Sequence, residues 1–203
     1  MKKYKILLAV ALCFILCSCQ KEENTQVEIK EHIYVEKEFV DSWEEECQDG
    51  RTYLQLVLDG GYKYRTNQSY LDKFFDDGGK IELYNYSIKK DQMIISGEFI
   101  PEYTIRLMHP HLDNILTEGV LMHELGHYFD FKYEFSNSET FKKMYEKYNG
   151  DDFDFQFHNN KKVDESEFFA ELFMEYTANQ DLNIPNDLKN YMDKICNRIL
   201  ENQ

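Results

Sequence analysis

The chain has 203 residues and a formal net charge of −15 at pH 7, with 38 acidic side chains against 23 Lys and Arg. An acidic chain does not neutralise phosphates, so these numbers argue against a nucleic-acid-binding protein. They weakly favour neutral or cationic substrates. No repeat and no Pro/Gly-rich linker divides the chain after about residue 31, which predicts one domain over residues 31–203 with room for a good core.

The N-terminus has the pattern of a bacterial export signal. Three lysines among the first five residues precede an apolar run over residues 6–16, which is too short to be a stable membrane anchor. The run ends in Leu16-Cys17-Ser18-Cys19, which resembles a lipobox. We therefore expect a lipoprotein signal peptide over residues 1–18, lipidation of Cys19 and a polar tether over residues 19–30. The alternative is an ordinary secretory signal with incidental cysteines.

Processing of this kind would place the protein on the extracellular face of the bacterial membrane, held by lipid. Loss of three lysines would take the basic residues from 23 to 20 against 38 acids, so the net charge would change from −15 to −18. Such a protein is repelled by an acidic membrane surface, whereas a two-chain lipid anchor holds stably. The alternative is a freely secreted protein. Of the remaining cysteines, Cys47 and Cys196 either form one disulfide or stay as thiols.

Local patterns between residues 39 and 108 predict helices followed by a sheet. Residues 39–47 resemble a short helix around Trp43, and residues 68–75 a helix that ends at Gly78-Gly79. Residues 51–58 carry both helix and strand signals. Alternating hydrophobicity predicts a small antiparallel sheet from the strands 80–86, 92–99 and 103–108. Four aromatic residues here are either core residues or substrate subsites: Tyr84, Tyr86, Phe99 and Tyr103.

The most informative pattern is His123-Glu124-Leu125-Gly126-His127, an HExxH motif. On a helix, positions i and i+4 lie on one face, so both imidazoles can bind one metal ion. Zinc suits this arrangement, because three protein ligands leave a position for water and Glu124 can accept a proton from that water. Val120, Leu121 and Leu125 would face a core. The alternative is a solvated helix that carries two histidines by chance.

The third ligand has to come from elsewhere, because Asp130 and Tyr133 occupy the Gly and His positions of the longer HExxHxxGxxH pattern. Residues 164–176 form an amphipathic pattern with Asp164 as its predicted N-cap. Glu167 is then either a capping-box residue on a solvated turn or a metal ligand. Glu171 shares its helix face, where two like charges repel unless a cation neutralises them. Further helices are expected over residues 138–148, with Ser136 and Glu139 as a capping box, and over residues 186–200 after Pro185.

The motif His-Glu-Leu-Gly-His-x-x-Asp, followed some 40 residues later by Glu-x-Glu-Phe-Phe-Ala-Glu, resembles the anthrax lethal factor peptidase family, which includes small secreted Pro-Pro endopeptidases. The resemblance covers about residues 116–176. It implies a zincin-like α+β fold, mostly helical, with a small antiparallel sheet beside the HExxH helix. It also implies that zinc binds His123, His127 and Glu167, and that Glu124 is the general base. Asp130 and Glu171 match supporting positions of the family motif.

One position departs from the family pattern. The family has a tyrosine seven residues before the ligand glutamate, where its hydroxyl can stabilise an oxyanion, and here that position is Asn160. An imidazole can do the same work, so His158 is one candidate donor and Tyr148 is another. The alternative for His158 is an ordinary loop residue. The departure affects the expected catalytic efficiency more than metal binding.

The leading hypothesis is a membrane-anchored zinc endopeptidase that binds a peptide in extended form along an edge strand. We expect a monomer that needs no nucleic-acid partner. The second hypothesis is a catalytically weak or inactive lipoprotein of the same fold that binds at the surface. A third is an acidic adhesin without zinc, in which HExxH occurs by chance.

Overall fold

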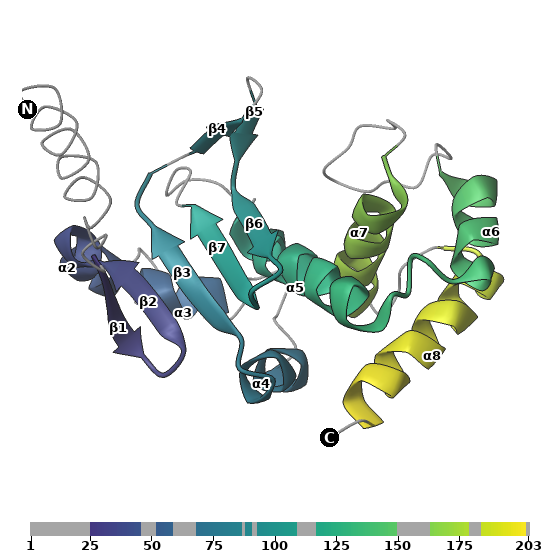
Figure 1. The fold of residues 1–203 in the computed structure, drawn as a ribbon, viewed down its shortest axis with the longest axis horizontal. Coiled ribbons are helices and arrows are strands. Elements are labelled where there is room, and N and C mark those ends of the chain that lie inside the picture. The colour runs from purple at the N-terminus through teal and green to yellow at the C-terminus, as the bar shows by residue number, and fades with distance from the viewer. Residues whose placement is uncertain are drawn as a thin grey trace, which may run out of the picture.

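The structure is a computed structural model and describes residues 25–45, 52–58, 68–86, 88–90, 93–108, 117–149, 163–178 and 184–201. Its sheet lies at one end of the molecule and the helices α6 (Glu139–Tyr148) and α8 (Asn186–Glu201) at the other, with α5 (Thr117–Tyr133) between them (Figure 1). This mixture of helices and a small sheet agrees with the predicted α+β class. The predictions for the signal peptide and for Cys19, Cys47, His158 and Asn160 lie outside the described residues.

The main sheet has the strand order β1-β2-β3-β7-β6 and is mixed. Strand β3 runs parallel to both of its neighbours, β2 and β7, whereas β1–β2 and β6–β7 are antiparallel. The bounds are β1 Gln26–Lys30, β2 Ile33–Glu36, β3 Lys80–Tyr84, β6 Gly97–Ile100 and β7 Thr104–Met108. The predicted antiparallel sheet is therefore wrong for β3 and β7. Long connections separate β2 from β3 and β3 from β7, and such connections permit parallel pairing.

Two predicted boundaries also change. Strand β1 falls within the tether predicted for residues 19–30, so the folded part begins earlier than the sequence indicated. The strand predicted over residues 92–99 is divided at Ser96. Its first part, β5 (Met93–Ile95), pairs with β4 (Ile88–Lys90) in a separate hairpin. Its second part is β6, which forms one edge of the main sheet.

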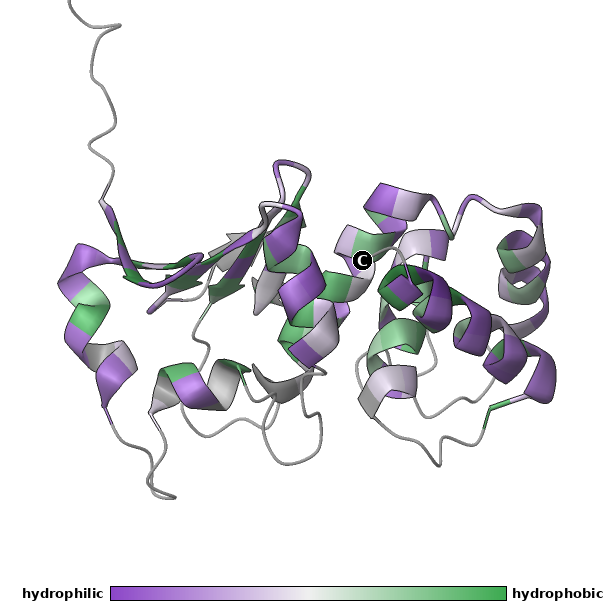
Figure 2. Cartoon of the chain, turned by 90° about the horizontal axis from the view of Figure 1, so that it is seen from below, coloured by the Kyte–Doolittle hydropathy of each residue, from purple (hydrophilic) through white to green (hydrophobic). Residues whose placement is uncertain are grey.

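The predicted helices are present, and the ambiguous segment 51–58 contains the helix α3 (Tyr53–Leu58). The remaining elements are η1 (Lys37–Phe39), α2 (Val40–Glu44), α4 (Gln68–Asp76) and α7 (Glu165–Ala178). The predicted cap of α6 is wrong, because Ser138 rather than Ser136 is its N-cap and accepts a hydrogen bond from the Phe141 N–H at 3.2 Å. Helices α4, α6 and α8 have hydrophobic and hydrophilic residues on different sides, as amphipathic helices require (Figure 2). The predicted amphipathic pattern of α7 is wrong, because its residues 168–175 are all buried.

Helix α5 is the centre of the fold. It packs most extensively against α7 and also contacts β6, β7, α3 and α4. Apolar residues of the sheet face the same core, because alternate residues of each strand point to one side. The buried members in the three central strands are Ile33, Val35, Ile81, Leu83, Ile105 and Leu107. Among the described residues, no helix combines the length and apolar character that crossing a membrane requires.

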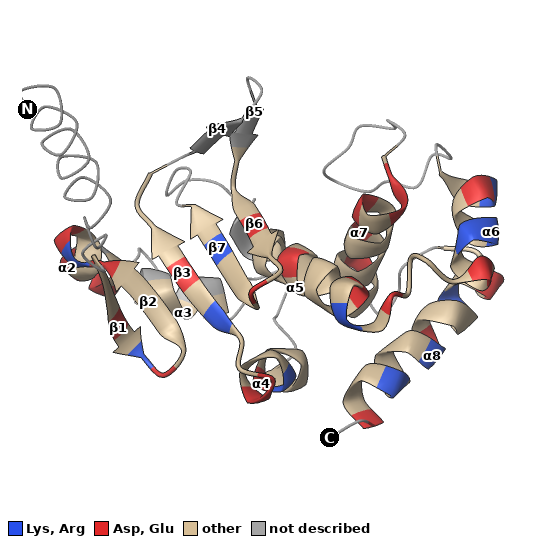
Figure 3. Cartoon of the chain, viewed as in Figure 1, with Lys and Arg blue, Asp and Glu red and all other residues tan. Residues whose placement is uncertain are grey.

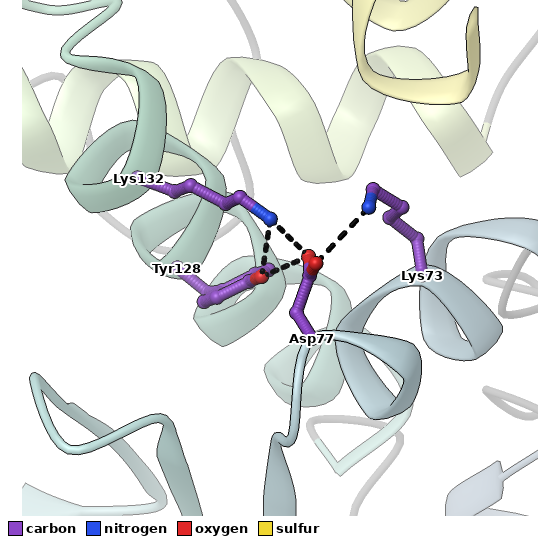
Figure 4. A network of polar contacts seen from close by, with 4 residues as sticks. All are labelled: Lys73, Asp77, Tyr128 and Lys132. Carbon is purple, nitrogen blue, oxygen red and sulfur yellow. Dashed lines mark hydrogen bonds and ion pairs between the residues drawn. The ribbon is translucent and has the colours of Figure 1, made fainter. Parts of the chain in front are cut away.

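A polar network joins α5 to the end of α4 (Figure 4). The Asp77 carboxylate accepts hydrogen bonds from the Tyr128 hydroxyl and from the ammonium groups of Lys132 and Lys73, the last at 3.0 Å. Burial alone would raise the pKa of Asp77, but these three donors lower it overall. The network therefore ties the helix that carries the HExxH motif to its neighbour.

Candidate metal centre

Helix α5 presents His123 and His127 on one face, while its other residues from 119 to 130 are buried. Val120, Leu121 and Leu125 are 6%, 0% and 0% exposed, which confirms the prediction that they face the core. The histidine side chains are 15% and 17% exposed, so they lie at the border between core and solvent. Imidazoles in such a place require polar partners.

The partner comes from α7 because the two helices approach very closely. A Cβ atom added to Gly126 would lie 2.8 Å from the Ala170 Cα, which is closer than real Cβ atoms come. Glycine at 126, between the two histidines, and alanine at 170 thus allow backbone to pack against backbone. This contact brings the first turn of α7, with Glu167, to the histidines.

The three side chains form a compact triangle of donor atoms. His123 Nε2 and His127 Nε2 are 3.1 Å apart. One carboxylate oxygen of Glu167 lies 3.4 Å from His123 Nε2, and the other lies 3.4 Å from His127 Nε2. All three residues can offer one ligand atom each within 4.8 Å of the others, so the group could hold a metal ion. Glu167 therefore faces the histidines, although the sequence also allowed it to be a solvated capping residue.

The N-terminus of α7 also orients the site. The Glu167 N–H donates to the Asp164 carboxylate at 2.9 Å, which confirms Asp164 as the cap. His127 Nδ1 lies 3.3 Å from the Ser166 hydroxyl. If the Nδ1–H donates this bond, Nε2 presents its lone pair to the centre of the triangle, as a metal ligand must. Sequence reasoning missed Ser166, because its only signal is that it precedes Glu167 on the first helical turn.

Charges at the triangle strongly favour a cation. Hydrogen bonds with His123 and His127 hold the pKa of Glu167 far below its usual range. Burial alone would lower the pKa of His127, but the hydrogen bond with Glu167 and the charge of Glu124 raise it overall. Both shifts show that a carboxylate next to the imidazoles favours positive charge at this place.

Glu124 lies next to the triangle and is only 5% exposed. Its carboxylate accepts a hydrogen bond from the backbone N–H of Phe99 in β6. A Cβ atom added to Gly97 would lie 2.7 Å from Glu124 Oε1, so glycine is needed where the strand meets this side chain. Burial raises the pKa of Glu124, while the two imidazoles oppose that rise. A carboxylate in this setting is suited to accept a proton near neutral pH.

The two expected supporting carboxylates are both buried. Asp130 is 6% exposed and accepts a hydrogen bond from the Ser136 N–H at 2.7 Å, so it fastens the turn that follows α5. It also lines the cleft and contributes to the raised pKa of His127. Glu171 is 1% exposed and lies one helical turn after Glu167 on α7.

The triangle lies in a cleft of about 1170 Å³ between β6 and the N-terminal end of α7. This volume exceeds the usual size of small-molecule pockets. Acidic residues lie on both walls, on β6 and at the start of α7 (Figure 3). The described lining contains a single Lys or Arg, Lys142. Of the four aromatic residues considered as subsites, Phe99 lines the cleft, whereas Tyr84, Tyr86 and Tyr103 do not.

Tyr148 does not reach this cleft. Its side chain is buried between α6 and α8, and its hydroxyl donates to the Asp187 carboxylate at 2.7 Å and 2.9 Å. Its proposed role as oxyanion donor is therefore wrong. The other candidate, His158, lies outside the described residues, and so does the position Asn160.

Cys196 is buried in α8 and forms no disulfide with another described residue. Its possible partner Cys47 lies outside that part of the chain.

Comparison of the chain with models of protein families and with curated proteins found no match in either case.

Proposed function

We propose that the protein is a zinc endopeptidase with His123, His127 and Glu167 as metal ligands and Glu124 as general base. The donor triangle carries this proposal. In a tetrahedral zinc site with bonds of 2.0–2.1 Å, neighbouring donor atoms are about 3.3–3.4 Å apart. The observed separations of 3.1, 3.4 and 3.4 Å match that spacing. Two imidazoles and one carboxylate are also a usual ligand set for catalytic zinc.

A zinc ion bound there would polarise the substrate carbonyl and acidify a water molecule. Glu124 would accept a proton from that water and pass it to the leaving amine. Its burial supports this role, because a carboxylate with a raised pKa holds a proton more readily. The Phe99 N–H orients the carboxylate, and the absence of a Cβ atom at Gly97 leaves room for it, since a Cβ there would lie 2.7 Å from Glu124 Oε1. Ser166 would orient His127 through its Nδ1 atom.

The substrate would bind in extended form beside β6. This strand is a sheet edge, and the backbone N–H and C=O groups of successive residues point alternately toward β7 and away from it. Ser96 accepts a hydrogen bond from Met108 at the end of β7, whereas the Phe99 N–H points away from β7 to Glu124. The backbone groups of Gly97 and the carbonyl of Phe99 therefore point toward the cleft. A peptide can use them as an added strand next to the catalytic carboxylate.

Two matched pairs of variants test the proposal. Glu167→Ala should lose most bound zinc in elemental analysis. Glu165→Ala, which removes the other acidic side chain in the first turn of α7, should keep about one zinc per chain. Glu124→Ala should keep zinc and the fold but lose hydrolysis by about 10²–10⁴-fold. Glu134→Ala, which removes another cleft carboxylate, should remain active. Full turnover by zinc-loaded Glu124→Ala would refute the mechanism.

A second candidate function is a surface binding lipoprotein with weak or no catalysis. The observation that favours it is the lining of the cleft, in which the described residues include no tyrosine hydroxyl to stabilise an oxyanion. Peptide binding without hydrolysis, by wild-type protein loaded with zinc, would select this function. Intact Glu124 in hydrogen-bonded contact with β6 favours the peptidase.

We also propose that Cys19 carries a lipid that holds the protein on the extracellular membrane face. Mass spectrometry of the mature N-terminus tests this. A diacylglyceryl group on Cys19 is the expected result. An unmodified protein in the culture supernatant, cleaved elsewhere, would identify a secreted enzyme.

A further inference from the structure

An exposed aromatic side chain lies beside the metal triangle. Phe131 is 50% exposed, one of three large hydrophobic residues with this status in the described parts of the chain. It follows His127 by four residues on α5 and so lies on the same helix face, about 6 Å further along the axis. It also lines the cleft. Exposed apolar surface next to a candidate reaction centre indicates a binding site more strongly than a single exposed ring elsewhere on the protein.

The ring belongs to an aromatic wall formed by Phe99 and Phe131, both of which line the cleft, as Pro101 does. The ring centroids of Phe99 and Phe131 are 5.7 Å apart. Tyr103 supports the wall from behind, with its ring 6.4 Å from Phe131 and 5.6 Å from the buried Tyr128. Tyr103 has a φ of 58°, an unfavourable value for a residue with a side chain. The contacts of the Tyr103 ring with Phe131 and Tyr128 hold the residue in this backbone conformation, and they fix the position of the wall.

We infer that the aromatic wall is a specificity subsite for an apolar side chain of the substrate, which rests on the proposed peptidase function. In paired strands, residues directly opposite each other point their side chains to the same face. Phe99 points toward α5, where its ring contacts Phe131. A substrate residue opposite Phe99 would therefore direct its side chain onto the Phe131 ring.

The position of this residue relative to the cleaved bond follows from Glu124. The carboxylate contacts β6 between Gly97 and Phe99, so the reacting peptide bond lies at the same level of the strand. The side chain on the wall then belongs to a residue within two positions of the cleaved bond. An acidic side chain is excluded there, because carboxylates of Glu98, Asp130 and Glu134 line the same cleft.

Cleavage mapping tests the subsite. Zinc-loaded wild-type protein is incubated with a peptide library made by tryptic digestion of a bacterial lysate, and the new termini are sequenced by mass spectrometry. We expect enrichment of Phe, Tyr, Leu, Ile or Met at one position within two residues of the cut. Phe131→Ala should reduce that preference about tenfold, whereas Phe131→Leu should retain most of it. Tyr86→Ala is the matched control, because Tyr86 is 43% exposed but does not line the cleft.

A binding measurement separates this inference from the peptidase proposal. Fluorescein-labelled decapeptides that differ only in having Phe, Ala or Glu at each position in turn are titrated into Glu124→Ala protein, with anisotropy as the readout. Tighter binding of the Phe peptide at one position, lost in Glu124→Ala/Phe131→Ala, would support the subsite. If the wild-type protein cleaves nothing, that lack of cleavage would overturn the peptidase proposal alone, and the binding result would still support the subsite. Equal binding of all three peptides, or a Phe preference that survives the loss of Phe131, would overturn the subsite.

Discussion

Gly126→Ala perturbs the contact that brings Glu167 to the two histidines. The new Cβ would lie 2.8 Å from the Ala170 Cα and 3.2 Å from its carbonyl oxygen, both backbone atoms of α7. Ordinary contact begins near 3.4 Å, so the helices must separate by about half an ångström. Glu167 moves with α7, while both histidines stay on α5. The two 3.4 Å separations between Glu167 and the histidines should therefore lengthen.

Two effects on stability oppose each other in this variant. Alanine in a helix interior is favoured over glycine by about 1 kcal/mol. Overpacking costs about 1–3 kcal/mol, so the net free energy of unfolding should fall by about 0–2 kcal/mol. The zinc affinity should fall by about 10- to 100-fold, because the proposed ligand Glu167 moves away from the histidines. The loss should stay within this range because Glu167 is displaced and not removed.

Competition with a chelator dye measures the zinc affinity of Gly126→Ala, and urea unfolding of the metal-free protein measures its stability. Gly79→Ala is the control, because its Cβ would meet the Phe74 ring at 2.4 Å, outside the cleft. This control should destabilise the fold and leave zinc affinity unchanged. Wild-type zinc affinity in Gly126→Ala would refute the claim that this helix contact sets the ligand geometry.

Four further results are expected. Ser166→Ala should weaken zinc binding by about 10- to 100-fold in the same dye assay, and unchanged affinity would show that Ser166 does not orient His127. Zinc affinity should rise with pH, and the midpoint of this rise should lie above pH 6.5. The raised pKa of His127 is the reason, because its proton competes with the metal; a midpoint below pH 6.5 would contradict this. In the metal-free protein, His127 contributes stability below pH 6.5 that is lost as pH rises through its raised pKa, so acidification to pH 6 should stabilise wild type relative to His127→Gln. Asp77→Asn should lower the free energy of unfolding by about 1–3 kcal/mol, because Lys73 and Lys132 lose their shared carboxylate, whereas the exposed Asp76→Asn should have little effect; equal stabilities of the two variants would show that the network is not stabilising.

The sequence alone determined the features that depend on neighbours along the chain. The four-residue spacing of His123 and His127 places them on one face of any helix, and the apolar residues around them define that helix. Asp164 was recognisable as a cap because a capping side chain acts within three residues. The helices over residues 68–75 and 186–200 follow from the same periodicity. These predictions needed no knowledge of what each element packs against.

Tertiary structure alone decided the features that join distant segments. Whether Glu167 faces solvent or the histidines depends on how closely α7 approaches α5, which the small residues Gly126 and Ala170 allow. Strand direction was likewise not encoded in alternation, since β3 and β7 alternate in the same way whether they are parallel or antiparallel. Tyr148 was a reasonable oxyanion donor by sequence position, but packing turns its hydroxyl to Asp187. In each case the deciding free energy is that of packing two segments far apart in the chain, and a local pattern carries no record of it.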